Sequence, residues 1–152
     1  MQNAVVYHGK FHTMVYHSKN TVVFLIWYTM VIFDKGGQLV VCHGALGSLH
    51  RVCVVGDDGK VTRSYGGQRG SDVGQLNWPR HLAVDKDSQF IFVADECNGR
   101  VVLLSPTLEF VRYVIEGLSW PRRLYFHQAT QRLFVGQANG DVSVIQLPVA
   151  SL

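Results

Sequence analysis

Charged residues are scarce in this sequence. Asp, Glu, Lys and Arg make up 16% of the 152 residues, while hydrophobic residues make up 47%. This balance excludes an intrinsically disordered chain, which combines low hydrophobicity with high net charge. The formal net charge is only +3, well short of a basic patch that would by itself indicate nucleic-acid binding. We expect one folded domain that permits an anionic partner without requiring one.

Long apolar runs and a secretory leader are also lacking. The uncharged run TVVFLIWYTMVIF spans residues 21–33, which is short of the roughly 20 residues that a membrane-spanning helix needs. Its β-branched and aromatic residues favour one or two buried strands over a membrane anchor. Residues 1–20 contain neither the cationic start nor the small-residue cleavage site of a signal peptide, so the sequence does not support export.

Cysteine is limited to Cys42, Cys53 and Cys97. An odd number of cysteines, inside or beside apolar runs, argues against a disulfide framework and favours a reducing, cytoplasmic location. Cys42 and Cys53, with His43 and His50, form the only cluster that suggests zinc, but their spacing matches no zinc finger or knuckle. We therefore predict no metal and no cofactor.

An internal repeat is what the sequence does contain. The stretch LNWPRHLAVDKDSQFIFVADECNGRVVLLS (residues 76–105) is repeated in GLSWPRRLYFHQATQRLFVGQANGDVSVIQL (residues 117–147). A fainter copy without the Trp-Pro-Arg opening covers residues 31–67. At an offset of 42 residues the matched pairs include Trp78 with Trp120, Pro79 with Pro121, Arg80 with Arg122, Leu82 with Leu124 and Phe92 with Phe134; after a one-residue gap Asn98-Gly99 matches Asn139-Gly140.

The spacing inside one copy predicts an antiparallel meander. The expected strands are Arg80–Val84, Phe90–Ala94, Val101–Leu104 and Phe110–Ile115, which lie too close together for crossover helices. The early strands are almost entirely apolar, as in strands that are covered on both faces, whereas the last strand includes polar residues. A period of about 40 residues with this gradient is typical of a propeller blade.

The best copy, YGGQRGSDVGQLNWPRHLAVDKDSQFIFVADECNGRVVLLS, resembles an NHL repeat. It has the glycine, the proline, a strand ending in Asp85, a Val-Ala strand ending in Asp95, and then Asn98, Arg100 and a valine-rich strand. The resemblance is strongest over residues 74–104, moderate over 117–147, weak over 31–67 and absent before residue 22. The last copy departs from the pattern, with His127 in place of Asp85 and Gln137 in place of Asp95.

The resemblance implies an all-β fold of about three four-stranded antiparallel blades in an incomplete ring. We expect blades at residues 31–67, 74–116 and 117–147 within a propeller fragment of 31–152. Residues 1–30 would form an irregular or capping segment with apolar strands. NHL propellers usually have six blades, which need on the order of 250 residues. Further blades of a longer chain or a second, self-associated copy would close the ring; a short protein capped by its N-terminal segment is the remaining alternative.

The repeat also predicts a candidate binding face. The loops before the first strand and between the second and third strands of each blade fall on one face, because successive strands alternate in direction. Guanidinium groups there suit phosphates or an acidic protein segment. The alternative is that Arg80 and Arg122 brace neighbouring blades through loop carbonyls or carboxylates such as Asp95. The candidate ligand-binding residues are Arg69, Arg80, Asn98, Arg100, Arg122, Arg123 and Asn139.

Other repeated residues are interpreted as structural. Trp78 and Trp120 could stack on bases, but we expect them to pack between blades beside Pro79 and Pro121. Asp85 and Asp95 are expected to close the turns that follow their strands. No Ser/His/Asp order, phosphate loop or carboxylate pair stands out, so we predict no catalytic residue.

These observations favour a non-catalytic binding or scaffold module that recognises a protein segment or single-stranded RNA. The resemblance adds two alternatives. NHL repeats often end tripartite-motif ubiquitin ligases, so the chain could be the substrate-recognition part of a ligase whose RING region is absent here. Related propellers include amidating lyases and lactonase-like hydrolases with metal in the central channel, and His127 opposite Asp85 is the one residue pair that hints at such an enzyme.

Overall fold

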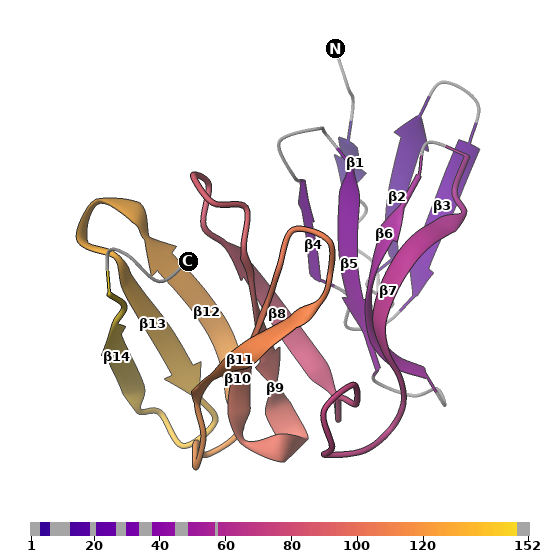
Figure 1. Cartoon of the computed structure of the whole chain (residues 1–152). Helices are drawn as coiled ribbons and strands as arrows, with labels where there is room; N and C mark the ends of the chain where they lie inside the picture. Colours follow the sequence, from indigo (N-terminus) through magenta and orange to yellow (C-terminus); the bar gives the residue numbers. More distant parts are fainter. Residues whose placement is uncertain are drawn as a thin grey trace.

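The chain forms a series of small antiparallel sheets (Figure 1). The computed structural model describes residues 38–44, 49–56 and 58–148 in full, and before them the backbone of the strands β1 to β4. The all-β fold class predicted from the sequence is confirmed. The strands are β1 (Ala4–Val6), β2 (Thr13–Ser18), β3 (Thr21–Ile26), β4 (Met30–Phe33), β5 (Leu39–His43), β6 (Leu49–Val55), β7 (Val61–Gln68), β8 (Pro79–Val84), β9 (Ile91–Asp95), β10 (Arg100–Leu104), β11 (Phe110–Ile115), β12 (Pro121–His127), β13 (Arg132–Gln137) and β14 (Val142–Gln146).

The strands pair in sequence order. We name the sheets sheet N (β1–β3), sheet 1 (β4–β7), sheet 2 (β8–β11) and sheet 3 (β12–β14). The first strand of sheet 2, β8, contacts both β4 and β12, so the first strands of sheets 1, 2 and 3 lie next to one another, as around a propeller axis. The uncharged run at residues 21–33 contributes β3 and β4; the burial of its side chains lies outside the described residues.

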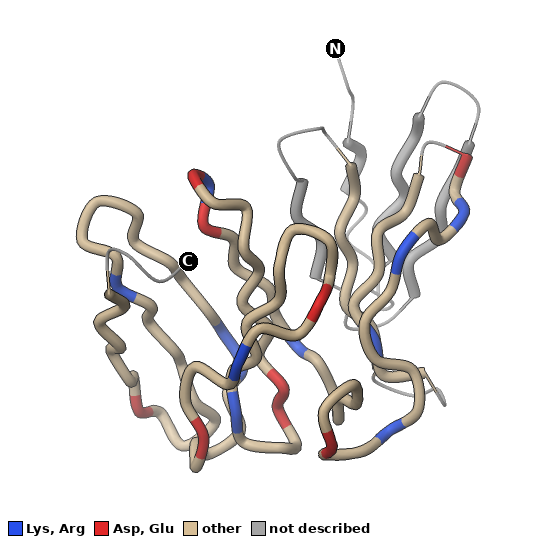
Figure 2. The backbone as a smooth tube through the Cα atoms, in the orientation of Figure 1, with Lys and Arg blue, Asp and Glu red and all other residues tan. Residues whose placement is uncertain are grey.

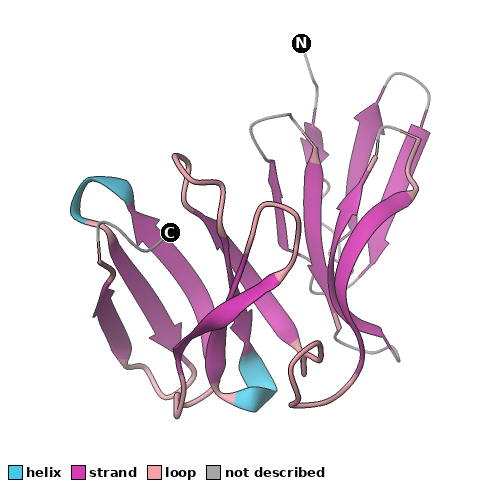
Figure 3. Cartoon of the chain, viewed as in Figure 1, coloured by secondary structure: helices cyan, strands magenta, loops and turns pink. Residues whose placement is uncertain are grey.

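Short 3-10 turns are the only helical elements in the described part of the chain. They are η1 (Glu96–Asn98), between β9 and β10, and η2 (Gln128–Thr130), between β12 and β13. Figure 3 shows them at opposite ends of the sheets. No helix within the described residues is long and apolar enough to cross a membrane.

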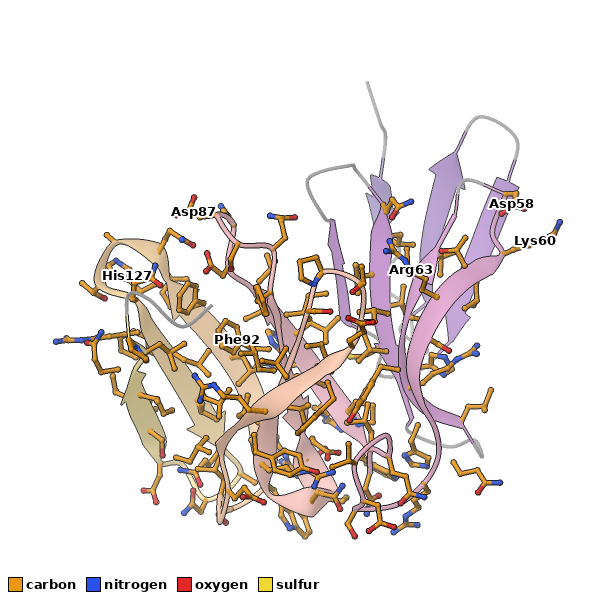
Figure 4. All side chains as sticks on the ribbon, in the orientation of Figure 1. Asp58, Lys60, Arg63, Asp87, Phe92 and His127 are labelled. Atoms are coloured by element: carbon orange, nitrogen blue, oxygen red, sulfur yellow. The ribbon has the colours of Figure 1, made fainter. Side chains whose placement is uncertain are left out.

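The two central strands of sheet 2, β9 and β10, are buried on both faces, which explains their nearly continuous apolar sequences. Every residue of β9 and β10 is buried. Val93 and Val102 point into an apolar layer shared with sheet 1. Phe92 and Leu103 point into the layer shared with sheet 3, where the Phe92 ring stacks on Phe126 at 5.1 Å between centroids (Figure 4). Each such side chain contributes about 1.5–3 kcal/mol through burial.

Different side chains close the equivalent turns of sheets 2 and 3. Asp85 accepts a hydrogen bond from the Ser88 hydroxyl at 2.6 Å. At the matching positions, His127 Nδ1 lies 2.7 Å from Thr130 Oγ1. The substitution of His127 for Asp85 therefore keeps a local polar contact across the turn. Both residues close turns in this structure.

A histidine bridges each of the two junctions that sheet 2 forms, one with sheet 1 and one with sheet 3. The N–H of Trp78 donates to Nδ1 of His50 at 2.9 Å, which joins sheet 1 to the start of sheet 2. The N–H of Leu124 donates to Nδ1 of His81 at 3.3 Å, which joins sheet 2 to sheet 3. An imidazole nitrogen can accept only when it is unprotonated. Burial, with a further contribution from the Arg123 charge, lowers the pKa of His81 to about 4.

The His81 bridge predicts a defined pH dependence of stability. The unfolded chain binds a proton at His81 near the ordinary pKa of 6.5, and the folded chain only near 4. The stabilising contribution is therefore complete above about pH 6.5 and is lost as the pH falls to about 4. In His81→Asn an amide oxygen can accept the same bond without titrating, so we expect the variant to lose less stability over this range. Urea unfolding at pH 7, 5.5 and 4.5 measures the difference; equal losses in both proteins would contradict the bridge.

Candidate binding edge

Two tryptophans take up an unusual backbone conformation at the start of β8 and β12. Trp78 has φ 59° and Trp120 has φ 54°, in the left-handed region, which costs a non-glycine residue about 1–3 kcal/mol. An equivalent backbone hydrogen bond holds each tryptophan. The Trp78 carbonyl accepts the N–H of Glu96 at 3.1 Å, and the Trp120 carbonyl accepts the N–H of Ala138 at 3.1 Å.

The residue before each tryptophan is also held in the same way. The N–H of Asn77 donates to Asp95 Oδ1 at 2.6 Å. The N–H of Ser119 donates to Gln137 Oε1 at 2.6 Å. Gln137 therefore replaces Asp95 as the acceptor, and the last copy of the repeat keeps this contact despite its departure from the pattern. These bonds bring together the loops that we predicted to share a face; we call this end of sheets 2 and 3 the arginine edge.

The tryptophan side chains differ in their surroundings. Trp78 is half-buried, but 56% of Trp120 is exposed. The sequence pattern predicts that Trp120 packs between blades, but within the described residues its side chain is largely exposed. The guanidinium carbon of Arg122 lies 5.8 Å from the centre of the Trp120 ring instead, within the range of a cation–π contact.

Arg100 is committed to the protein itself. It is 5% exposed, and its Nε donates to Asp95 Oδ2 at 2.8 Å. Its Nη1 and Nη2 donate to the carbonyls of Ser71 at 2.7 Å and Gln75 at 3.2 Å. The guanidinium carbon of Arg100 also lies 4.3 Å from the centre of the Tyr113 ring. Arg100 thus fixes the loop before β8 to the end of β9.

Asp95 is the acceptor at the centre of this network. It is fully buried, and burial raises the pKa of its carboxyl group, while bonds from Asn77, Asn98 and Arg100 act in the opposite direction. Asn98 Nδ2 donates both to Asp95 Oδ2 and to the carbonyl of Gly70, each at 2.8 Å. A carboxylate with no exposure depends on such partners, because water cannot reach it.

Glu96, which is not among the residues predicted from the sequence, lies between two arginines. It is 2% exposed and accepts a bond from Arg122 Nε at 2.7 Å. Arg80 Nη1 lies 3.5 Å from its other oxygen. The ion pair with Arg122 ties sheet 2 to sheet 3. The signal in the sequence was a second acid directly after Asp95, close to arginines repeated at a spacing of 42 residues.

The other candidate residues, Arg69, Arg123 and Asn139, are more exposed, and each makes its contacts separately from the others. Arg69 is exposed and forms an isolated parallel bridge with Leu76. Arg123 is exposed, and its Nη1 donates to the Arg122 carbonyl at 3.0 Å. Asn139 lies in an exposed turn, where its amide donates to Asp141 at 2.7 Å. Figure 2 shows basic and acidic segments interspersed along the arginine edge.

The cysteine and histidine cluster of sheet 1 is dispersed. Cys42 lies in the layer shared with sheet 2, and Cys53 lies in an apolar cluster with Leu39 and Val41. His43 Nε2 accepts a bond from Arg51 at 2.7 Å, and burial followed by the Arg51 charge lowers the pKa of His43. In the part of the chain that the structure describes, no group of three or more metal-binding side chains gathers.

Comparison with known proteins identifies a fold but no family. No protein-family model matches the chain, and no curated protein matches its sequence. A protein of unknown function from Bacteroides caccae has 13% identity and a TM-score of 0.56, over 93% of this chain and 54% of that one. Virginiamycin B lyase from Staphylococcus aureus has 11% identity and a TM-score of 0.57, over 91% and 50%. A streptogramin B lyase has 11% identity and a TM-score of 0.52, over 96% and 55%.

These likenesses support a propeller-like arrangement of the sheets. The chain spans about half the length of these structures. Sequence identities of 11–13% carry information on fold alone, since one propeller fold serves many unrelated functions. The resemblance to NHL repeats therefore stays a prediction.

The Arg100 network predicts a large loss of stability when it is broken. In Arg100→Ala the buried Asp95 carboxylate loses its ion pair, and two loop carbonyls lose their donors. We expect unfolding to become easier by about 3–5 kcal/mol, measured by urea denaturation at pH 7. Arg123→Ala is the control, because that exposed side chain makes one bond, and a change below about 1 kcal/mol is expected. Similar losses in the two variants would show that Arg100 does not hold the edge together.

Proposed function

We propose that this chain is a non-catalytic binding module of an NHL-type propeller that receives an acidic protein segment on the arginine edge. The single observation that supports it most is the exposed Trp120 ring with the Arg122 guanidinium beside it, and the exposed Arg123 that follows Arg122 in the chain. We call these three residues the cationic corner. An exposed aromatic ring and adjacent guanidinium groups are the side chains most enriched among energetically dominant residues of protein interfaces.

The contacts made within the protein determine which arginine side chains at this edge are still accessible to a ligand. Arg100 uses all three kinds of guanidinium nitrogen within the protein, so in this proposal it positions the edge. Arg80 lies mostly buried against Glu96. The Arg122 side chain remains 42% exposed despite its ion pair, and Arg123 is exposed. Both can still offer donors to a carboxylate.

The charge pattern favours a protein segment over RNA. Acidic segments alternate with basic ones along the edge (Figure 2), and the net charge of the whole chain is only +3. A polyanion gains from a continuous positive groove, whereas a peptide with spaced carboxylates can fit separate cations. The proposal also includes a cytoplasmic location, and blades at residues 31–67, 74–116 and 117–147.

Binding of an acidic peptide tests this proposal. The probe is a short fluorescein-labelled peptide of alternating Glu and Gly, followed by fluorescence anisotropy at low salt. We expect Trp120→Ala combined with Arg123→Ala to weaken binding about tenfold or more, and added salt to weaken binding of the wild type. Arg63→Ala is the matched control, because Arg63 lies on β7 and is bonded to Gln38 rather than to the edge (Figure 4).

Three results would overturn the proposal. One is the absence of peptide binding at low salt. Another is equal binding by the double variant and by Arg63→Ala. The third is tighter binding of a labelled oligouridine than of the peptide with the same dependence on Trp120 and Arg123, which would assign the corner to single-stranded RNA.

A further inference from the structure

Sheet 3 has one strand fewer than its neighbours in the described part of the chain. Sheets 1 and 2 each contain four strands, whereas sheet 3 contains three. In the complete sheets a fourth strand, β7 or β11, pairs with the third strand, β6 or β10. The repeat places β14 at the position of β10, because Asn139-Gly140 matches Asn98-Gly99. The outer edge of β14 is therefore the place that β11 occupies in sheet 2.

The backbone of β14 directs unpaired groups toward this edge. The N–H of Gln137 donates to the Asp141 carbonyl, and the N–H of Leu147 donates to the Gln131 carbonyl, each at 2.9 Å. In an antiparallel ladder, hydrogen-bonded residues alternate with residues whose N–H and C=O point the other way. Val142, Val144 and Gln146 consequently point their backbone N–H and C=O away from β13, toward an edge that no described strand covers (Figure 1).

The side chains of β14 do not prevent another strand from pairing with its outer edge. Exposed edge strands are usually protected by charges, prolines or bulges. β14 has the sequence VSVIQ, without charge or proline, and its pairing with β13 is regular. Val142 is 63% exposed and Val144 is 53% exposed. An uncharged, regular and exposed edge strand of this kind is a ready acceptor for another strand.

Sheet 2 shows which residue types a fourth strand at this position contains. Its fourth strand, β11, has the sequence FVRYVI. Phe110 and Tyr113 pack against the layer between sheets 1 and 2, with ring centroids 5.0 Å apart. On sheet 3, Ile145 packs against the layer shared with sheet 2, so an aromatic or aliphatic residue of an added strand would extend that layer.

We propose that the outer edge of β14 binds an extended protein segment as a fourth, antiparallel strand. The segment has five or six residues rich in aromatic and β-branched side chains, and lacks proline. Backbone hydrogen bonds to Val142, Val144 and Gln146 provide the affinity, and alternate side chains provide the specificity, as in β-strand addition. This edge is separate from the cationic corner, so the proposal does not rest on the proposed function.

The test uses a peptide whose sequence is already suited to such an edge. The probe is a fluorescein-labelled synthetic peptide with the sequence EFVRYVIE, residues 109–116 of this chain. Val144→Pro removes an outward N–H and leaves the bonds to β13 intact, since Val144 does not donate to β13. Val144→Thr is the control, because it keeps the N–H and the branched shape. Urea unfolding checks that each variant is folded.

We expect the peptide to bind the wild type and Val144→Thr with affinities within about twofold, and Val144→Pro at least tenfold more weakly. Two further peptides, N-methylated at the odd or at the even residues, provide a second test that needs no variant. Only the peptide whose methyl groups replace the N–H groups facing β14 should lose binding. Failure of the unmodified peptide to bind the wild type overturns the proposal. So does undiminished binding to a folded Val144→Pro variant, which would mean that the peptide replaces β11 or binds elsewhere.

Discussion

Both faces of β9 and β10 are buried, and this burial determines how the neighbouring sheets are arranged. A strand covered on two sides must be apolar at every position, and the residues of these strands lie almost completely out of contact with water. The neighbouring sheets must then stack on either side, so the charged residues of β9 and β10, Asp95 and Arg100, lie at the strand ends. The arginine edge is the result of this arrangement, since it gathers the strand ends and turns of sheets 2 and 3.

Charged side chains that are buried at the strand ends need partners of opposite charge. Asp95 and Glu96 are almost fully buried at the end of β9, and each takes an arginine from an adjoining segment. These pairs fix loops and join sheets at a desolvation cost that only good geometry offsets. The Arg122 side chain stays 42% exposed although its partner Glu96 is buried, and Arg123 is exposed, so these are the two arginines that the proposed cationic corner uses.

Much of the fold followed from the repeat, because a spacing shared by two copies fixes both strand positions and turn positions. The segment expected at Arg80–Val84 is β8, and the one expected at Phe110–Ile115 is β11. The site was less predictable. The exposure of Trp120 depends on what covers it, and the pairing of Glu96 with Arg122 depends on the distance between two sheets. Neither quantity is a property of local sequence.

Sheet 2 is enclosed between sheets 1 and 3, while no described strand covers the outer edge of β14. Amide hydrogen exchange measured residue by residue distinguishes these surroundings, since protection follows burial and hydrogen bonding. We expect the slowest exchange in β9 and β10. In β14 we expect alternation, with slow exchange at Ser143 and Ile145 and fast exchange at Val142 and Val144. Uniform protection along β14, or exchange in β9 as fast as in β14, would show that the sheets are not arranged in this way.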